Sequence, residues 1–143
     1  MKVLIDTNVL LDVLLEREDK FRSSAVVWEL CAKEKVDAYV AAISFNNVHY
    51  IVTAQKSREI AYRAVTLVRD IFRTVLLNDR IINQSIDAHW KDFEDAIQYF
   101  SAIHADADYI VTRNVSDFPK EGIAIMTPED FISFAENKLF DHD

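Results

Sequence analysis

Short aliphatic and β-branched runs recur along the chain and alternate with longer segments whose apolar residues have helical spacing. Five of these runs are typical of strands: 2–6 (KVLID), 36–42 (VDAYVAA), 74–78 (TVLLN), 108–112 (DYIVT) and 123–127 (IAIMT). The last two runs show little alternation of polar and apolar residues. We therefore expect those two strands to be buried on both faces.

The segments between these runs carry apolar residues three or four positions apart, which predicts amphipathic helices. These segments are 7–16, 19–35, 57–72 and 92–105. A further helix is expected after the fifth run, because Thr127 suits an N-cap and Pro128 suits the first helical position. Strands that alternate with helices predict an α/β sandwich, with a central parallel sheet of about five strands flanked by helices.

Composition limits the chemistry that the chain can carry. Its 143 residues are half hydrophobic and 28% charged, which predicts one globular domain over 1–143. Gly122 is the only glycine, so glycine-rich phosphate-binding loops are excluded. Cys31 is the only cysteine, which excludes a disulfide framework and a thiolate zinc site.

The expected location is the cytoplasm. A lone cysteine fits a reducing compartment. Asp6 and Asp12 interrupt the apolar N-terminus, which therefore does not read as a signal peptide. No apolar stretch reaches the roughly 20 residues that span a bilayer, so we expect no membrane partner.

Charge is unevenly distributed along the chain. The net charge is −8, from 24 acidic and 16 basic residues, which argues against binding nucleic acid through overall charge. Segment 56–80 nevertheless has six bases and three acids, and Arg69 and Arg73 share one face of its predicted helix. This segment is either a solvated surface or a site of phosphate contact.

Carboxylates lie at or near the ends of predicted elements, where a parallel sheet places its functional site. Asp6 ends the first run, and Asp117 follows the fourth. Asp92 and Asp95 are three residues apart at the start of a predicted helix, where they share a face. Each position alone also has a structural explanation, as a helix cap, a response to the helix dipole or part of a polar turn.

Taken together, these carboxylates point to a metal site. Several carboxylates that face one crevice repel one another, and some stay protonated unless a cation is present. Mg²⁺ and Mn²⁺ prefer oxygen ligands, and such a metal can activate water and stabilise a phosphoryl oxyanion. The predicted metal ligands are Asp6, Asp95 and Asp117.

Three blocks carry a family resemblance: Asp6 to Leu10, Asp92 to Ala96, and Thr112 to Phe118. In this order and spacing, the chain resembles PilT N-terminal (PIN) domains, including VapC-type toxin ribonucleases. The resemblance implies a three-layer sandwich and Mg²⁺- or Mn²⁺-dependent endoribonuclease activity on RNA phosphodiesters. It also implies the toxin half of a type II toxin–antitoxin pair, an antitoxin protein encoded nearby, and a homodimer.

The resemblance also assigns roles by position. Asp6 resembles the first metal ligand and Asp95 the third acid, with Asp92 one helical turn before it. Asn8 and Thr112 resemble the small polar residues that hydrogen-bond the site.

The segment after the fourth strand supplies the remaining candidates. Asn114 falls where many members have a fourth acid, and Asp117, three residues later, is expected to supply that charge. Arg113 lies between Thr112 and Asn114, where we expect it to meet the scissile phosphate.

One position departs from the family pattern. The second acid, usually a Glu in the helix after the second strand, falls on Asn47, or on Asn46 if the register slips by one. An amide can coordinate a metal or orient a water, but it cannot carry negative charge or act as a base. The alternative is therefore a catalytically weak or inactive PIN-fold module that binds RNA or protein. A small phosphatase or receiver-like domain ranks third, because the chain lacks a DxDxT motif.

Overall fold

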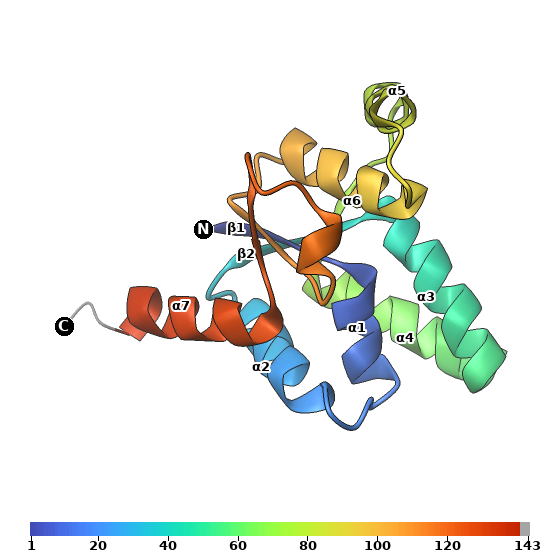
Figure 1. The fold of residues 1–143 in the computed structure, drawn as a ribbon. Helices are drawn as coiled ribbons and strands as arrows, with labels where there is room; N and C mark the ends of the chain where they lie inside the picture. Colours follow the sequence, from blue (N-terminus) through green and yellow to red (C-terminus); the bar gives the residue numbers. More distant parts are fainter. Residues whose placement is uncertain (141–143) are drawn as a thin grey trace.

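Five parallel strands form the centre of the computed structural model, which describes residues 1–140 (Figure 1). The last three residues of the predicted domain lie outside the described part. The strands are β1 (Lys2–Ile5), β2 (Asp37–Ala41), β3 (Arg73–Val75), β4 (Tyr109–Val111) and β5 (Ala124–Met126). Each lies within one of the five predicted runs except β3, which begins one residue earlier, so the predicted α/β fold with a parallel sheet is confirmed.

The order of the strands fixes where a site can form. The sheet runs β3-β2-β1-β4-β5, so β1 is central. The strands β2 and β3 lie on one side of it, and β4 and β5 lie on the other. A crevice opens at the carboxyl ends of the strands where the direction of winding changes. The backbone N–H of Asp6 donates to the carbonyl of Val111 at 3.0 Å, which places Asp6 directly at this switch point.

Seven α-helices connect and cover the strands within residues 1–140. They are α1 (Thr7–Leu14), α2 (Phe21–Ala32), α3 (Ala42–Gln55), α4 (Arg58–Ile71), α5 (Asp79–Ala88), α6 (Phe93–His104) and α7 (Pro128–Phe140). Thr127 accepts the backbone N–H of Asp130 at 3.1 Å, as its predicted N-cap role requires. None of the described helices has both the length and the apolar character that crossing a membrane requires.

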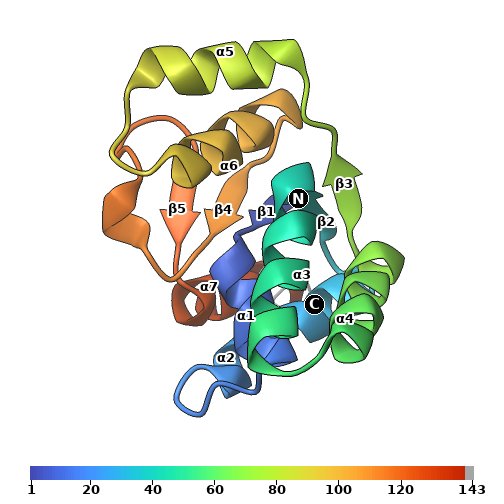
Figure 2. The ribbon, with the colours of Figure 1, turned by 90° about the vertical axis from the view of Figure 1, so that its right-hand side faces the viewer.

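The core has two parts, one on each face of the sheet. Side chains alternate along a strand, so Val3 and Ile5 of β1 pack into one cluster and Leu4 into the other. The first cluster is covered by α1, α2, α3, α4 and α7, and the second by α5 and α6. Figure 2 shows α5 and α6 together on one side of the sheet.

One burial prediction was wrong. The run 123–127 was expected to be buried on both faces, but Ala124 is exposed and Ile125 and Met126 are only partly buried. The reason is topological, because β5 is an edge strand that pairs with β4 alone. In β4, by contrast, Ile110 and Val111 are fully buried.

Candidate active site

Asp6 lies at the end of β1 and serves two structural contacts at once. Its side chain is 2% exposed. Oδ1 accepts the backbone N–H of Thr7 at 2.7 Å and caps α1, while Oδ2 accepts the hydroxyl of Thr112 at 2.7 Å. Asn8 follows in the first turn of α1 and is partly buried. The capping role and the site position predicted for Asp6 are therefore compatible.

The start of α6 contributes three acidic residues. Asp92 is the N-cap, and its Oδ1 accepts the backbone N–H of Asp95 at 3.3 Å. It therefore precedes the first turn, rather than sharing a face with Asp95 inside the helix as the sequence predicted. Asp95 is only 6% exposed, and its Oδ2 is buried without a hydrogen-bond partner among residues 1–140. Glu94, which lies between them and is partly buried, was not among the predicted site residues.

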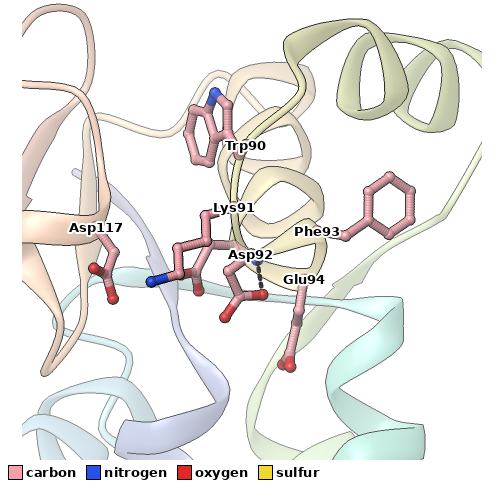
Figure 3. A pocket seen from close by; sticks show the side chains of 7 residues that line it. Trp90, Lys91, Asp92, Phe93, Glu94 and Asp117 are labelled. Atoms are coloured by element: carbon pink, nitrogen blue, oxygen red, sulfur yellow. Dashed lines mark hydrogen bonds between the residues drawn. The ribbon is translucent and has the colours of Figure 1, made fainter.

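Asp117 faces these residues from the far side of a cavity of about 510 Å³ (Figure 3). It is exposed, and it lies in the short 3₁₀ helix Val115–Asp117 that follows β4. In Figure 3 the carboxylates of Asp92, Glu94 and Asp117 point toward the same side of the cavity. The cavity is lined by Trp90, Lys91, Asp92, Phe93, Glu94, Asp95 and Asp117.

The carboxylates are close enough to shift one another's titration. Burial, followed by the charges of Asp92, Asp6, Asp117 and Glu94, raises the pKa of Asp95 to about 7. Burial also raises the pKa of Asp6 to about 6, although the hydrogen bonds from Thr112 and Thr7 oppose that rise. Near neutral pH the cluster therefore shares protons that a bound cation would displace.

These residues fit a hydrated divalent cation better than a fully caged one. No three His, Cys, Asp or Glu side chains of the described chain converge closely enough to enclose a metal ion. Mg²⁺, however, is commonly held by one or two carboxylates and several waters. A buried, unpaired carboxylate oxygen such as Asp95 Oδ2 is also costly without a positive or hydrogen-bonding partner. The donor set is thus suited to Mg²⁺ or Mn²⁺.

A buried polar network underlies the acidic residues. Thr7 Oγ1 and Ser44 Oγ are 2.8 Å apart, and Gln98 Nε2 donates to them at 3.1 and 3.0 Å. Gln98 lies one turn after Asp95, so the network joins α1, α3 and α6 beneath the carboxylates. Sequence reasoning missed this network, although a glutamine among the apolar positions of α6 was a usable signal.

Asn47, rather than Asn46, faces the site. Its Nδ2 donates to Glu94 Oε1 at 2.7 Å, whereas Asn46 is exposed. On the other side of the crevice, the backbone N–H of Asn114 donates to Thr112 Oγ1 at 3.1 Å, and the Asn114 side chain is exposed. Asn114 therefore contacts the site through its backbone.

Arg113, which was predicted to meet the scissile phosphate, is engaged by other residues in the structure. Its guanidinium binds Asp12 at 2.8 Å and Glu129 at 2.6 Å, and neither of these residues lines the acidic cavity. It also donates to the carbonyl of Lys20 and to two serine hydroxyls. Asp12 is fully buried, so Arg113 neutralises a buried charge. The residues next to Arg113 in the sequence give no sign of this partner.

A family profile and a known protein each match most of this chain. The family profile described as "PIN domain" matches residues 2–116. Ribonuclease VapC1 of Aquifex aeolicus is 24% identical over 135 residues, which cover 91% of this chain and 92% of that protein.

Solved structures share the fold. One is the structure of VapBC2 from Rickettsia felis bound to a DNA fragment from its promoter. It matches with a TM-score of 0.69 and 16% identity, over 89% of this chain and 98% of that chain. A toxin–antitoxin complex from Klebsiella pneumoniae matches with a TM-score of 0.67 and 21% identity, over 88% and 97%.

Proposed function

This chain belongs to the PIN domain family and is distantly related to VapC ribonucleases, and on that premise we propose that it is a Mg²⁺- or Mn²⁺-dependent endoribonuclease that hydrolyses RNA phosphodiesters. The observation that carries the proposal is Asp95, whose Oδ2 is buried without a hydrogen-bond partner among residues 1–140, and whose pKa is raised by burial and by the charges of Asp92, Asp6 and Asp117. Such an arrangement is unfavourable without a cation, and it suits a divalent cation that also binds a phosphate.

Asp6, Asp95 and Asp117 are the residues proposed to hold the cation. When bound, the cation supplies positive charge that polarises the phosphate and an attacking water. Thr112 and the backbone N–H of Thr7 fix the Asp6 carboxylate, so its orientation is set before substrate arrives. Asn8, Asn47, Asp92 and Asn114 are proposed to support substrate or ligands from the rim, and Arg113 is left out of this set.

A direct assay tests the proposal. Purified protein is incubated with end-labelled single-stranded and structured RNAs in Mg²⁺, in Mn²⁺ and in EDTA. We expect cleavage with either metal, none in EDTA, and none from Asp95→Asn. Cleavage that persists in EDTA, or that survives Asp95→Asn, would contradict the metal-dependent mechanism.

A module that binds RNA or protein without cutting is the second candidate. The amides at Asn47 and Asn114, where acids were expected, favour it. Binding of labelled RNA with no cleavage in any metal would support this candidate over the enzyme.

The proposed partners are an antitoxin encoded nearby and a second copy of this chain in the cytoplasm. Support comes from the solved relatives, one of which is a toxin–antitoxin complex. Co-expression with the adjacent reading frame should yield a complex in which cleavage is suppressed. Light scattering of the purified chain should give the mass of a homodimer.

A further inference from the structure

One hydrogen bond joins helices that approach the cavity from different parts of the chain. Nδ2 of Asn47, in α3, donates to Oε1 of Glu94, in the first turn of α6, at 2.7 Å. Both side chains are partly buried. Glu94 Oε2 accepts no hydrogen bond from the described residues, so one oxygen is fixed and the other is available.

Glu94 is the neighbour of Asp95 in the first turn of α6. Glu94 also lines the cavity beside Asp92 and opposite Asp117. Glu94 is therefore a further acidic group of this site, besides Asp92 and the three predicted ligands, and it is held from the α3 side.

A helix-dipole explanation accounts for only part of this arrangement. An acidic residue in the first turn of a helix is stabilised by the dipole whatever its side-chain direction. It needs no donor from another helix, and ordering a long side chain costs conformational entropy. The Asn47 contact adds direction, because it restricts the Glu94 carboxylate to the edge of the cavity nearest α3. Asp95, whose Oδ2 has no hydrogen-bond partner within residues 1–140, lines the same cavity.

We infer that Glu94 is an additional acidic group for the divalent cation of this site, reached directly or through a bound water, and that Asn47 is the positioning residue that aims it. The inference rests on the proposed function and deepens it. In this pair, Glu94 on α6 supplies the negative charge, and Asn47 on α3 sets the orientation of the Glu94 carboxylate.

Titration calorimetry with Mn²⁺ tests this inference without any measurement of activity. Glu94→Gln keeps an oxygen that can accept the Asn47 hydrogen bond but removes the charge, so a purely structural role would survive it. We expect Glu94→Gln to weaken Mn²⁺ binding about tenfold or more and Asn47→Ala to weaken it several-fold. We expect the double variant to bind about as weakly as Glu94→Gln alone, because the two residues act as a unit.

Glu59→Gln is the matched control, because Glu59 also occupies the first turn of a helix but is exposed on α4. Its Mn²⁺ affinity should equal that of the unchanged protein. Circular dichroism and melting curves check that each variant is folded, and Glu94→Asp supplies a second, charge-retaining substitution that should lose less affinity than Glu94→Gln.

The outcomes separate the two claims. If the unchanged protein binds Mn²⁺ and Glu94→Gln binds equally well, the role of Glu94 is overturned and the proposed function stands. Additive losses in the double variant would overturn the positioning role of Asn47. If the unchanged protein binds no Mn²⁺ at millimolar concentration, both the inference and the metal-dependent function fail.

Discussion

Thr112 Oγ1 donates a 2.7 Å hydrogen bond to Oδ2 of Asp6, and thereby joins the carboxyl ends of the neighbouring strands β1 and β4. Thr112 is fully buried, and its hydroxyl also accepts the backbone N–H of Asn114. The contact therefore links the segment that contains Asp117 to the central carboxylate. A buried polar group without a partner is costly, so this link is a structural requirement as well as a means of orientation.

Thr112→Val tests that link, because it keeps the shape of the side chain and removes the hydroxyl. We expect a loss of about 1–3 kcal/mol in the free energy of unfolding, since Asp6 Oδ2 and the Asn114 N–H lose their partner. Urea unfolding measures the change. Thr66→Val is the control, because the Thr66 hydroxyl bonds an exposed helical carbonyl. A Thr112→Val variant as stable as this control would show that the contact is unimportant.

Asp95→Asn should abolish RNA cleavage without unfolding the protein. Burial, followed by the charges of nearby carboxylates, raises the pKa of Asp95 to about 7, so removing its charge relieves repulsion in the metal-free state. We expect the melting temperature without metal to be unchanged or higher. Differential scanning calorimetry and the RNA assay are run on the same preparation. Loss of both stability and cleavage would instead identify Asp95 as a structural residue.

The stability of the metal-free protein should depend on pH. The pKa values of Asp6 and Asp95 are raised from 3.8 to about 6 and about 7, so the folded state holds protons that the unfolded state has released. Folding is then favoured at low pH, and this stability is lost as pH rises through about 6 to 7. Melting temperatures measured in EDTA should therefore rise from pH 8 to pH 5.5.

Asp95→Asn should flatten that profile, because it removes the group with the larger shift. The acid-labile pair of Glu129 and Arg113 acts in the opposite direction. Burial alone would raise the pKa of Glu129, but the hydrogen bond and charge of Arg113 lower it, so its stabilisation is lost at low pH. A profile that falls steadily from pH 8 to pH 5.5 would show that the acidic cluster does not control stability.

Mn²⁺ or Mg²⁺ should raise the melting temperature, and Asp6→Asn should remove most of that rise. A ligand that binds only the folded state adds about 2.7 kcal/mol at a hundredfold excess over Kd. Asn keeps one oxygen that can accept the backbone N–H of Thr7, and its NH2 group can donate to the Thr112 hydroxyl oxygen, which makes it a cleaner test than Ala. The absence of any shift at millimolar metal would contradict the metal site.

Local sequence patterns were sufficient for the strands and most helices. Each strand lies within a short aliphatic or β-branched run or overlaps one, and the Thr127-Pro128 start signal is local by nature. Pairing order is not local, so the edge position of β5 and its exposed Ala124 could not be read from its composition. The helices α3 and α5 were not among the segments predicted from periodicity, and only the family resemblance implied a helix after the second strand. Few residues of α5 are buried.

The acidic residues of the site could be predicted from the sequence. Residues whose role depends on contacts with distant parts of the chain could not. Asp95 and Asp117 line one cavity, and the charge of Asp6 also acts on Asp95, so a shared role for the three residues stays a prediction. Arg113 could not be assigned, since its partner Asp12 is about a hundred residues away in sequence and becomes buried only in the folded protein. Glu94 was overlooked because its importance depends on contact with a different helix.

Asn47→Glu should make the metal-free protein less stable and increase its response to metal. The substitution replaces a donor to Glu94 with a second carboxylate, so a 2.7 Å hydrogen bond becomes a repulsive pair within an already acidic cluster. A divalent cation offsets that repulsion, and the Mn²⁺-induced rise in melting temperature should therefore exceed that of the unchanged protein. Asn46→Glu is the matched control, because Asn46 is exposed on the adjacent position of α3 and should be nearly silent in both measurements. If Asn46→Glu shows the effect and Asn47→Glu does not, Asn46 rather than Asn47 faces the cation. If neither variant changes the response to Mn²⁺, α3 does not border the metal site.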